Sequence, residues 1–296
     1  MKIKILVDAA SNLFKKILKE KNVDIKVLNM RLMIGENSYN CYDDDFDVDE
    51  FSNTYYEAIK NGERVHTTLI SPGEYWESFQ NEVDQGNYVI CYTMARGISG
   101  TYESACLARD EINAKYDEPR VYIIDSMTAG FGEGLQALHA FEVAKNYEDI
   151  GDLVEYLGQF RLKVRSEFTV DDIRYLLKTG RVSRYLAKFI KLINIKVLLK
   201  SGDESKIVFA GPAFGRKNSI KKLADMVINK VDQDFPQIIY ITHCNILEDA
   251  EKLKELIAEG GVKTNIEIYQ YDFISGAHIG PNSLAVFYVS KLEDKD

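Results

Sequence analysis

The stretch YVICYTMARGISGTYESACLARDEINAK, residues 88–115, indicates the fold class. Its first seven residues are mostly apolar or aromatic, which is typical of a buried strand. A glycine-rich loop follows over residues 96–101, and we expect a helix from 102 to 115. A buried strand, a short loop and a helix form the unit from which helix-covered parallel sheets are built. The stretch therefore predicts an α/β protein.

The same order recurs on both sides of this stretch. Ser71-Pro72-Gly73-Glu74 is a strong helix start, because Ser71 can cap the helix, Pro72 fits the first turn and Glu74 completes a capping box. In the first part of the chain we expect strands over residues 3–7, 23–33 and 121–125, and helices over 13–21, 50–60 and 130–144. This part is predicted to be a Rossmann-like N-terminal domain, residues 1–160, with a mainly parallel sheet.

The order changes past Asp149. A hairpin is expected around Gly202, between strands 195–199 and 206–210, so antiparallel pairs enter the sheet. Further strands are expected over residues 166–171, 238–242, 266–271 and 284–289, and helices over 152–162, 220–231 and 247–259. The second part, residues 161–296, is therefore predicted to be a C-terminal α/β domain with a mixed sheet and helices.

Composition excludes several classes of protein. The 296 residues carry a net charge of −9, which disfavours nucleic-acid binding, because that depends on Lys and Arg against phosphate. No apolar run approaches the roughly 20 residues that cross a bilayer. Asp8 interrupts the apolar residues 5–7 before a signal peptide can form, and the four cysteines show no C-x-x-C spacing. We therefore expect a cytoplasmic protein with reduced thiols, and place Cys91 and Cys244 in its core.

The acidic run from Asp43 to Glu50 has one alternative interpretation. Starting at Asp45 it gives D-x-D-x-D, as in a calcium-binding loop, but Glu50 stands where such a loop needs Gly and Tyr56 where it needs Glu. We favour a solvated loop in which Asp47 or Asp49 caps the next helix. No two histidines have metal-ligand spacing, and no metal is expected.

The loop Gly97-Ile98-Ser99-Gly100-Thr101 is a candidate anion site. A glycine-rich turn from a strand into a helix directs backbone N–H groups and the positive end of the helix dipole toward the same point. The loop lacks the lysine of a Walker loop, does not match G-x-G-x-x-G, and departs from the nucleophile elbow G-x-S-x-G at Thr101. A helix cap supplied by Ser99 or Thr101 explains the pattern equally well.

Two other segments carry polar groups that a ligand could use. Thr67 and Thr68 end an extended stretch just before the Ser71 cap, and their hydroxyls could donate to an anion; ordinary strand threonines are the alternative. His278 lies in Gly276-Ala277-His278-Ile279-Gly280-Pro281, which predicts a functional loop rather than packing in a helix or strand. A histidine satisfied by backbone groups is the alternative here.

Together these segments resemble the DegV family of bacterial fatty-acid-binding proteins. The resemblance covers nearly the whole chain, and it depends on the order and spacing of the motifs. The motifs that carry the resemblance are Asp8, Thr67, residues 71–74, Ser99-Gly100-Thr101-Tyr102, Ile124-Asp125-Ser126, Gly180-Arg181-Val182-Ser183, Asn194-Ile195-Lys196, Gly215-Arg216-Lys217 and residues 276–281.

The resemblance implies a non-catalytic carrier that holds one long-chain fatty acid between two domains. The family's carboxylate-binding residues fall on Thr67, Ser99 and His278. It also implies a fatty-acid kinase that phosphorylates the presented acid, no cofactor, and only transient contact with membranes; we expect a monomer. Secondary candidates for the ligand site are Asp8, Thr68, Arg96, Gly97, Gly100, Thr101 and Gly280, with Arg96 adding a positive charge beside the loop.

Two other functions remain open from the residues alone. A serine hydrolase acting on a lipid-like ester would use Ser99 as nucleophile and His278 as base. A nucleotide or sugar-phosphate binder would use the glycine-rich loops, although the chain lacks a lysine or an acidic ribose ligand at the expected spacing.

Overall fold

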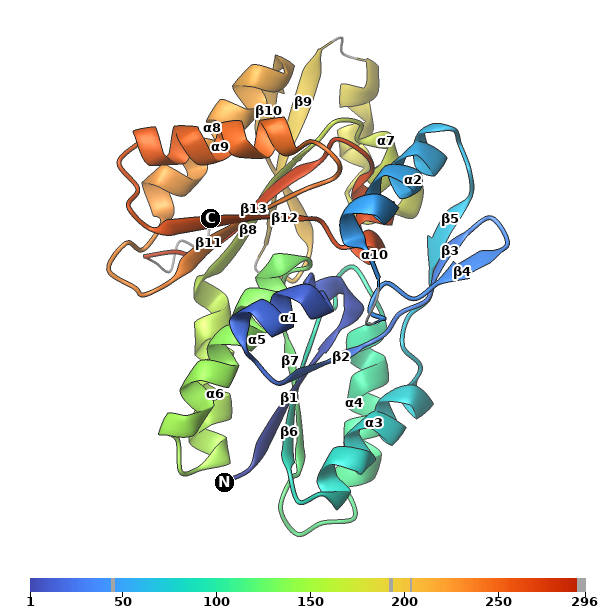
Figure 1. Ribbon diagram of the computed structural model, residues 1–296, viewed down its shortest axis with the longest axis vertical. Helices are drawn as coiled ribbons and strands as arrows, with labels where there is room; N and C mark the ends of the chain where they lie inside the picture. Colours follow the sequence, from blue (N-terminus) through green and yellow to red (C-terminus); the bar gives the residue numbers. More distant parts are fainter. Residues whose placement is uncertain (44–45, 192–193, 203, 292–296) are drawn as a thin grey trace.

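The protein is described by a computed structural model that covers residues 1–43, 46–191, 194–202 and 204–291. Two α/β layers lie one above the other along the longest axis (Figure 1). Most of the N-terminal half forms the lower layer and most of the C-terminal half the upper one, while the helix over residues 48–60 lies level with the upper layer. Among the described residues, no helix is long and apolar enough to cross a membrane.

The lower layer is built on a parallel four-stranded sheet, as the sequence predicts. Its strand order is β2-β1-β6-β7, and neighbouring strands all run in the same direction. The strands are β1 (Ile3–Asp8), β2 (Ile25–Leu28), β6 (Tyr88–Thr93) and β7 (Val121–Asp125). In Figure 1, α3 (Pro72–Asp84) and α4 (Thr101–Asn113) lie on one side of this sheet. On the other side are α1 (Lys15–Lys21), α5 (Phe131–Val143) and α6 (Ile150–Phe160).

The upper layer contains the predicted mixed sheet, in the order β10-β9-β8-β13-β11-β12. Only the β11–β12 pair is parallel; the other pairs are antiparallel. The strands are β8 (Val164–Val170), β9 (Ile195–Ser201), β10 (Ile207–Phe214), β11 (Ile238–His243), β12 (Asn265–Gln270) and β13 (Leu284–Val289). Helices α8 (Gly215–Lys230) and α9 (Leu247–Glu259) pack together over it, while α7 (Arg174–Thr179) and α10 (Phe273–Ile279) lie beside each other at its edge.

A small antiparallel sheet, β4-β3-β5, projects to one side and was not expected from the sequence. Its strands are β3 (Leu32–Ile34), β4 (Asn37–Tyr39) and β5 (Val65–Thr67), and α2 (Val48–Lys60) lies between the last two in sequence. The extended stretch over 23–33 is therefore divided between two sheets. Short 3₁₀ turns complete the described elements: Ala9–Ser11, Ala144–Asn146, Arg161–Lys163 and Arg184–Lys191.

Two helix starts follow from local chemistry, as predicted. The Glu74 N–H donates to Ser71 Oγ at 3.3 Å, and the Ser71 N–H donates to the Glu74 carboxylate at 2.8 Å, which forms the capping box. Asp47 caps α2 by accepting from the N–H groups of Asp49 and Glu50. The alternative calcium loop begins at Asp45, which lies outside the described residues together with Asp44. Asp203 lies outside them as well.

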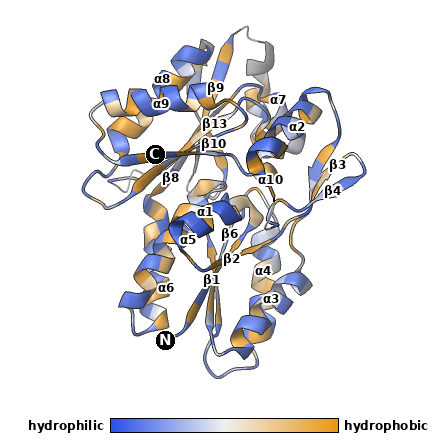
Figure 2. Ribbon diagram, viewed as in Figure 1, coloured by the Kyte–Doolittle hydropathy of each residue, from blue (hydrophilic) through white to orange (hydrophobic). Residues whose placement is uncertain are grey.

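The apolar core continues from one layer into the other. Hydrophobic residues gather on the strands and on the inner faces of the helices (Figure 2). One cluster includes Ile5 and Phe131 from the N-terminal half and Tyr240 and Phe287 from the C-terminal half, and the rings of Phe131 and Tyr240 stack 3.9 Å apart. Cys91 and Cys244 are fully buried, as expected. The two layers are thus held together by apolar contact, while a division into domains 1–160 and 161–296 remains a proposal.

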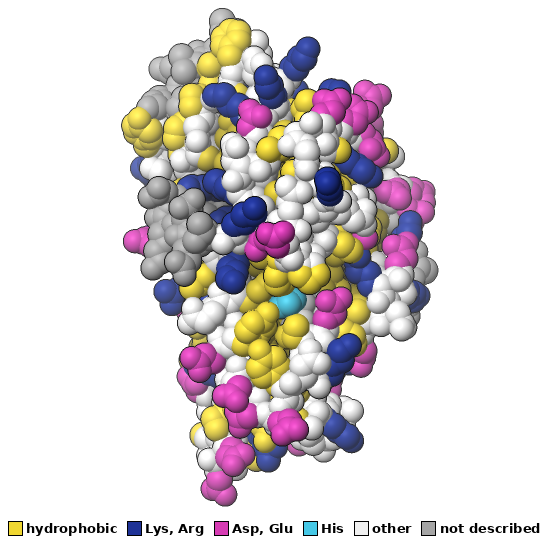
Figure 3. Space-filling view, turned by 90° about the vertical axis from the view of Figure 1, so that its left-hand side faces the viewer, with side chains coloured by type: hydrophobic (Ala, Val, Ile, Leu, Met, Phe, Trp, Pro, Cys, Tyr) yellow, Lys and Arg dark blue, Asp and Glu magenta, His cyan; other side chains and the backbone are white. Residues whose placement is uncertain are grey.

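Apolar side chains also reach the surface where the layers meet. Figure 3 shows hydrophobic side chains gathered around a histidine on the face that carries α5 and α6. A groove at this junction is lined by Leu138 and His139 of α5, Phe160 of α6 and Phe235. The imidazole of His139 forms a hydrogen bond of 2.8 Å with the Tyr156 hydroxyl and stacks on the Phe160 ring.

Candidate functional site

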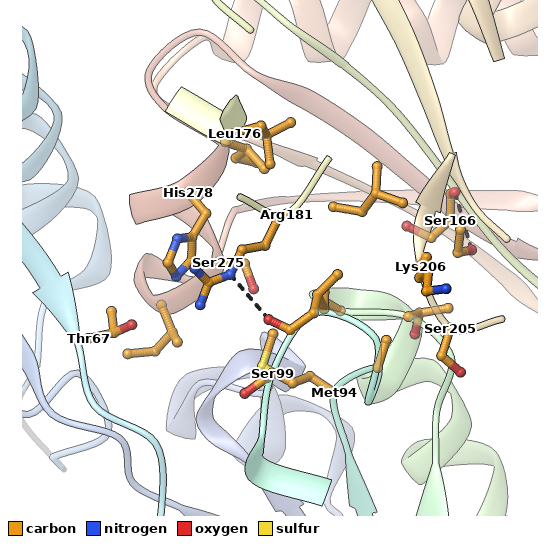
Figure 4. A pocket seen from close by; sticks show the side chains of 18 of the residues that line it. Thr67, Met94, Ser99, Ser166, Leu176, Arg181, Ser205, Lys206, Ser275 and His278 are labelled. Atoms are coloured by element: carbon orange, nitrogen blue, oxygen red, sulfur yellow. Dashed lines mark hydrogen bonds between the residues drawn. The ribbon is translucent and has the colours of Figure 1, made fainter. Parts of the chain in front are cut away.

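A cavity lies between the two layers and takes its wall from both (Figure 4). The space open to the centre of a water-sized sphere is about 170 Å³. Most of the wall is apolar, and the residues that form it are Met30, residues 67–69, 94–95, 98–100 and 127–129, Ser166, Phe168, Leu176, Arg181, Ser201, residues 205–207, Tyr271, Ile274, Ser275, His278 and Ile279.

The loop after β6 forms one wall, and Asp8 holds its start. The Met94 N–H donates to Asp8 Oδ2 at 2.9 Å, and the Ala10 N–H donates to Oδ1 at 2.8 Å. Asp8 is fully buried, and burial raises the pKa of its carboxyl to about 6. Its own N–H donates to Glu133. Asp8 therefore positions the loop from behind; it does not line the cavity, although the sequence suggested it as a ligand.

The members of the glycine-rich loop have different surroundings. Ser99 and Gly100 line the cavity, and Ser99 Oγ accepts from the Thr101 N–H at 3.3 Å. Thr101 itself is fully buried outside the cavity lining, with its hydroxyl 2.9 Å from that of Tyr75. At Gly97 a Cβ atom would stand 2.3 Å from the Ser205 carbonyl oxygen. Gly97 therefore allows the loop to meet the β9–β10 turn, and neither Gly97 nor Thr101 contributes to the cavity wall.

Thr67 and Thr68 both line the cavity, from the end of β5. The Thr68 hydroxyl accepts from the Arg31 N–H at 3.2 Å, and the Thr68 N–H donates to the Arg31 carbonyl. Thr68 is thus tied to the segment before β3. The Thr67 backbone pairs with Leu32 of β3, and its side chain faces the cavity (Figure 4).

His278 lies on a helix, and the prediction of a loop is wrong. Asp272 caps α10 by accepting from the Ser275 N–H at 2.6 Å, and the helix runs to Ile279. The glycines at 276 and 280 misled the sequence interpretation: a Cβ at Gly276 would press on the Tyr56 hydroxyl. Gly280 ends the helix with φ of 79°, packs against the Tyr175 ring, and does not line the cavity.

The imidazole of His278 faces the cavity in a poorly hydrated setting (Figure 4). Its Nδ1 atom is buried and has no hydrogen-bond partner among the described residues. Burial, and then the nearby Arg181 guanidinium, lowers the pKa of His278 to about 4. The ring is therefore neutral at pH 7 and can donate one hydrogen bond.

Arg181 is a cavity residue that the sequence argument did not select. Its Nε donates to the Ile98 carbonyl at 3.2 Å, and a terminal nitrogen donates to the Thr179 carbonyl. Gly180, in the left-handed region at φ of 72°, ends α7 and turns the chain toward the cavity. A helix-ending glycine followed by arginine was visible in the sequence, but the partner loop lies more than eighty residues away.

Arg96, which was expected to add a positive charge beside the glycine-rich loop, pairs with a carboxylate instead. Its Nε lies 3.6 Å from a carboxylate oxygen of Asp125, and the side chain is 58% exposed. It is absent from the described wall of the cavity. The positive charge that faces the candidate ligand-binding residues belongs to Arg181.

The arrangement favours an anionic head group with an apolar tail. Arg181, His278, Ser275 and Ser99 lie near one another in Figure 4, with Thr67 on the same side. No Asp or Glu belongs to the described lining of the cavity, so nothing there neutralises Arg181. In the described part of the chain there is also no group of three or more His, Cys, Asp or Glu placed to hold a metal.

The same geometry disfavours a serine hydrolase. A catalytic histidine needs a group that orients its second nitrogen, usually a carboxylate. His278 Nδ1 has no such partner in the described structure, and Ser99 Oγ accepts from a backbone N–H. The hydrolase hypothesis therefore lacks the contacts that would activate Ser99.

Comparisons with known proteins agree with this picture. Residues 2–291 match the model of the DegV family, whose description is an uncharacterised protein. A DegV domain-containing protein of Clostridium perfringens is 29% identical over 293 residues, which is 99% of each chain. A DegV family protein of Thermus thermophilus, described with fatty acid binding, has a TM-score of 0.83 at 19% identity, covering 98% of this chain and 100% of that one. The fatty acid kinase B3 protein of Streptococcus pneumoniae, loaded with linoleic acid, has a TM-score of 0.79 at 19% identity, covering 98% and 99%.

Proposed function

This chain belongs to the DegV family, and on that premise we propose that it binds one long-chain fatty acid in the cavity between its layers. Thr67, Ser99 and His278 hold the carboxylate, together with Arg181. The observation that carries the proposal is an apolar cavity with hydroxyl, imidazole and guanidinium groups on one side and no carboxylate among its described lining residues. The carboxylate of the bound acid is then the counterion of the Arg181 guanidinium.

The energetics fit this assignment. Burying about 14 methylene groups at about 0.8 kcal/mol each gives roughly 11 kcal/mol of gross driving force. The loss of translational freedom and the ordering of the chain offset several kcal/mol of it. Hydrogen bonds from charged groups add about 1.5–3 kcal/mol each. The tail therefore sets most of the affinity, and the head-group residues set the orientation.

We extend the proposal to a partner. The protein acts as a non-catalytic carrier that presents the carboxylate to a fatty-acid kinase, which phosphorylates it. The head-group end suits this role, because Leu69 lines the cavity there and is 48% exposed, so the carboxylate lies near the surface. The similarity to the Streptococcus pneumoniae protein, whose name places it in a fatty acid kinase system, supports this extension.

Mass spectrometry tests ligand binding directly. Lipid is extracted from the purified protein, and native spectra are recorded before and after loading with oleic acid. We expect one fatty acid per chain, and a monomer. Ser99→Ala and His278→Ala are expected to lower occupancy while keeping the fold, whereas Ser38→Ala, on the exposed strand β4, keeps full occupancy. A folded protein that neither carries nor takes up a fatty acid would contradict the proposal.

The kinase step needs a separate test. The oleate-loaded protein is mixed with a purified fatty-acid kinase and ATP, and acyl phosphate is trapped with hydroxylamine as the hydroxamate. We expect hydroxamate only when kinase and carrier are both present. Binding of oleate without hydroxamate formation by any kinase tested would leave the carrier role intact and overturn the partnership.

A further inference from the structure

The cavity has polar groups at two ends, and the binding of an ordinary fatty acid uses only one of them. Figure 4 places His278, Arg181 and Ser275 on one side and Ser166, Ser205 and Lys206 on the other. Between them the wall is apolar and includes Met94, Ile98, Met127, Phe168 and Leu176. An acyl chain anchored at His278 therefore runs toward a second polar region.

Two serines on neighbouring strands define this second region. Ser166 lies on β8 two residues before Phe168, and residues two apart in a strand face the same side. Ser201, the last residue of β9, donates from its hydroxyl to the Ser166 carbonyl at 3.5 Å. Both side chains line the cavity. The two hydroxyls therefore lie on one face of the upper sheet, beneath the apolar wall.

The Ser166 hydroxyl opens onto the cavity, and no described residue uses it. The residue is only 6% exposed, and its hydroxyl makes no hydrogen bond to any described residue. The neighbouring polar groups are already engaged: Ser205 Oγ donates to Asp125 at 2.5 Å, and the Lys206 ammonium lies 2.7 Å from Glu204. Ser166, with Ser201 beside it, is the polar group that a ligand's tail would meet.

We propose that the preferred ligand is a long-chain fatty acid that carries a hydroxyl near the far end of its tail, bound by Ser166 and Ser201. The inference rests on the proposed function and narrows its substrate class. A plain methyl end would cover the Ser166 hydroxyl without giving it a partner, which is costly for a buried polar group. A ligand hydroxyl can accept from the Ser166 hydroxyl and donate to Ser201 Oγ, whose own proton goes to the Ser166 carbonyl. Sites built to hydrogen-bond a ligand hydroxyl discriminate strongly against analogues that lack it.

The test is a displacement assay with a fluorescent fatty acid as the reporter. Competitors are the unbranched saturated acids from dodecanoic to octadecanoic acid, each with its ω-hydroxy derivative and its α-hydroxy derivative. For at least one chain length we expect the ω-hydroxy acid to bind more tightly than its parent. In the Ser166→Ala/Ser201→Ala variant the same ω-hydroxy acid should lose at least tenfold relative to its parent. Ser38→Ala should keep the wild-type ratio.

The outcomes separate this inference from the proposed function. If no ω-hydroxy acid binds the wild type more tightly than its parent, the inference is overturned and the fatty-acid carrier stands. The same holds if the double variant keeps the wild-type ratio at all lengths. If no acid displaces the reporter, the proposed function fails first. The α-hydroxy acids, which place the hydroxyl at the head group, should not respond to the double variant.

Discussion

Replacing Arg181 with methionine tests the head-group assignment most directly. The guanidinium has five N–H donors, and two of its nitrogens are occupied by the carbonyls of Ile98 and Thr179. The remaining donors face a cavity whose described lining contains no carboxylate. Methionine keeps an unbranched apolar stem but removes the charge and every donor. The substitution therefore removes the interaction with an anionic ligand and the bonds to the carbonyls of Ile98 and Thr179.

The expected magnitude follows from the kind of bond that is lost. A hydrogen bond involving a charged group contributes about 1.5–3 kcal/mol, which is roughly a ten- to hundredfold increase in Kd. Isothermal titration calorimetry with oleate measures this change. Methyl oleate has the same tail without the charge, so its affinity should change less than threefold. The ester also separates the loss of charge from any displacement of the loop.

The variant should also change His278. Because the Arg181 charge lowers the pKa of His278, its removal raises that pKa above about 4, while burial still holds it below the ordinary value of 6.5. Histidine NMR titration of the ligand-free protein checks this. Arg174→Met is the matched control, since Arg174 is an exposed arginine at the start of the preceding helix, α7, and pairs with Asp172. The reasoning is refuted if Arg181→Met leaves oleate affinity unchanged, or weakens oleate and methyl oleate equally.

Three further outcomes follow from the same contacts. Ser99→Ala and His278→Ala should each weaken oleate binding by roughly three- to thirtyfold, through loss of one hydrogen bond, with thermal midpoints close to that of the wild type. Gly97→Ala should lower the free energy of unfolding by about 1–3 kcal/mol in urea titrations, because its Cβ would overlap the Ser205 carbonyl oxygen; unchanged stability would show that the loop and the turn can separate freely. Asp8 has a folded pKa of about 6 against an unfolded value of 3.8, so the folded state binds the proton more tightly. Its contribution to stability is therefore greatest below pH 4 and is lost as pH rises through 6, and Asp8→Asn should flatten that part of the stability profile.

Local chemistry made much of the fold predictable. The bounds of the strand 121–125, the helix 247–259 and the strand 284–289 agree with the structure, because each is a continuous apolar or amphipathic segment with clear ends. The cap at Ser71 needs only four consecutive residues. The small sheet β4-β3-β5 was missed because its strands have three residues each and are stabilised by pairing with one another.

The candidate site was only partly predictable. Thr67, Ser99 and His278 line one cavity, but the secondary candidates Asp8, Gly97, Thr101 and Gly280 act behind it or at its edges. The sequence alone does not distinguish Arg96 from Arg181, since each arginine is next to a glycine. What separates them is that Asp125 pairs with Arg96, whereas Arg181 reaches Ile98 across the cavity.

The α/β class, the parallel and mixed sheets and the family resemblance could be predicted from the residues alone, because strand and helix periodicity and capping are encoded within a few residues. Tertiary structure alone decided which polar groups face the ligand. His278 lies on a helix because Asp272 caps it, and Ser166 lies at the far end of the cavity because β8 pairs with β9. Charge neutralisation and burial depend on neighbours that are distant in sequence, so the head-group set and the second polar end emerge only when the two layers pack together.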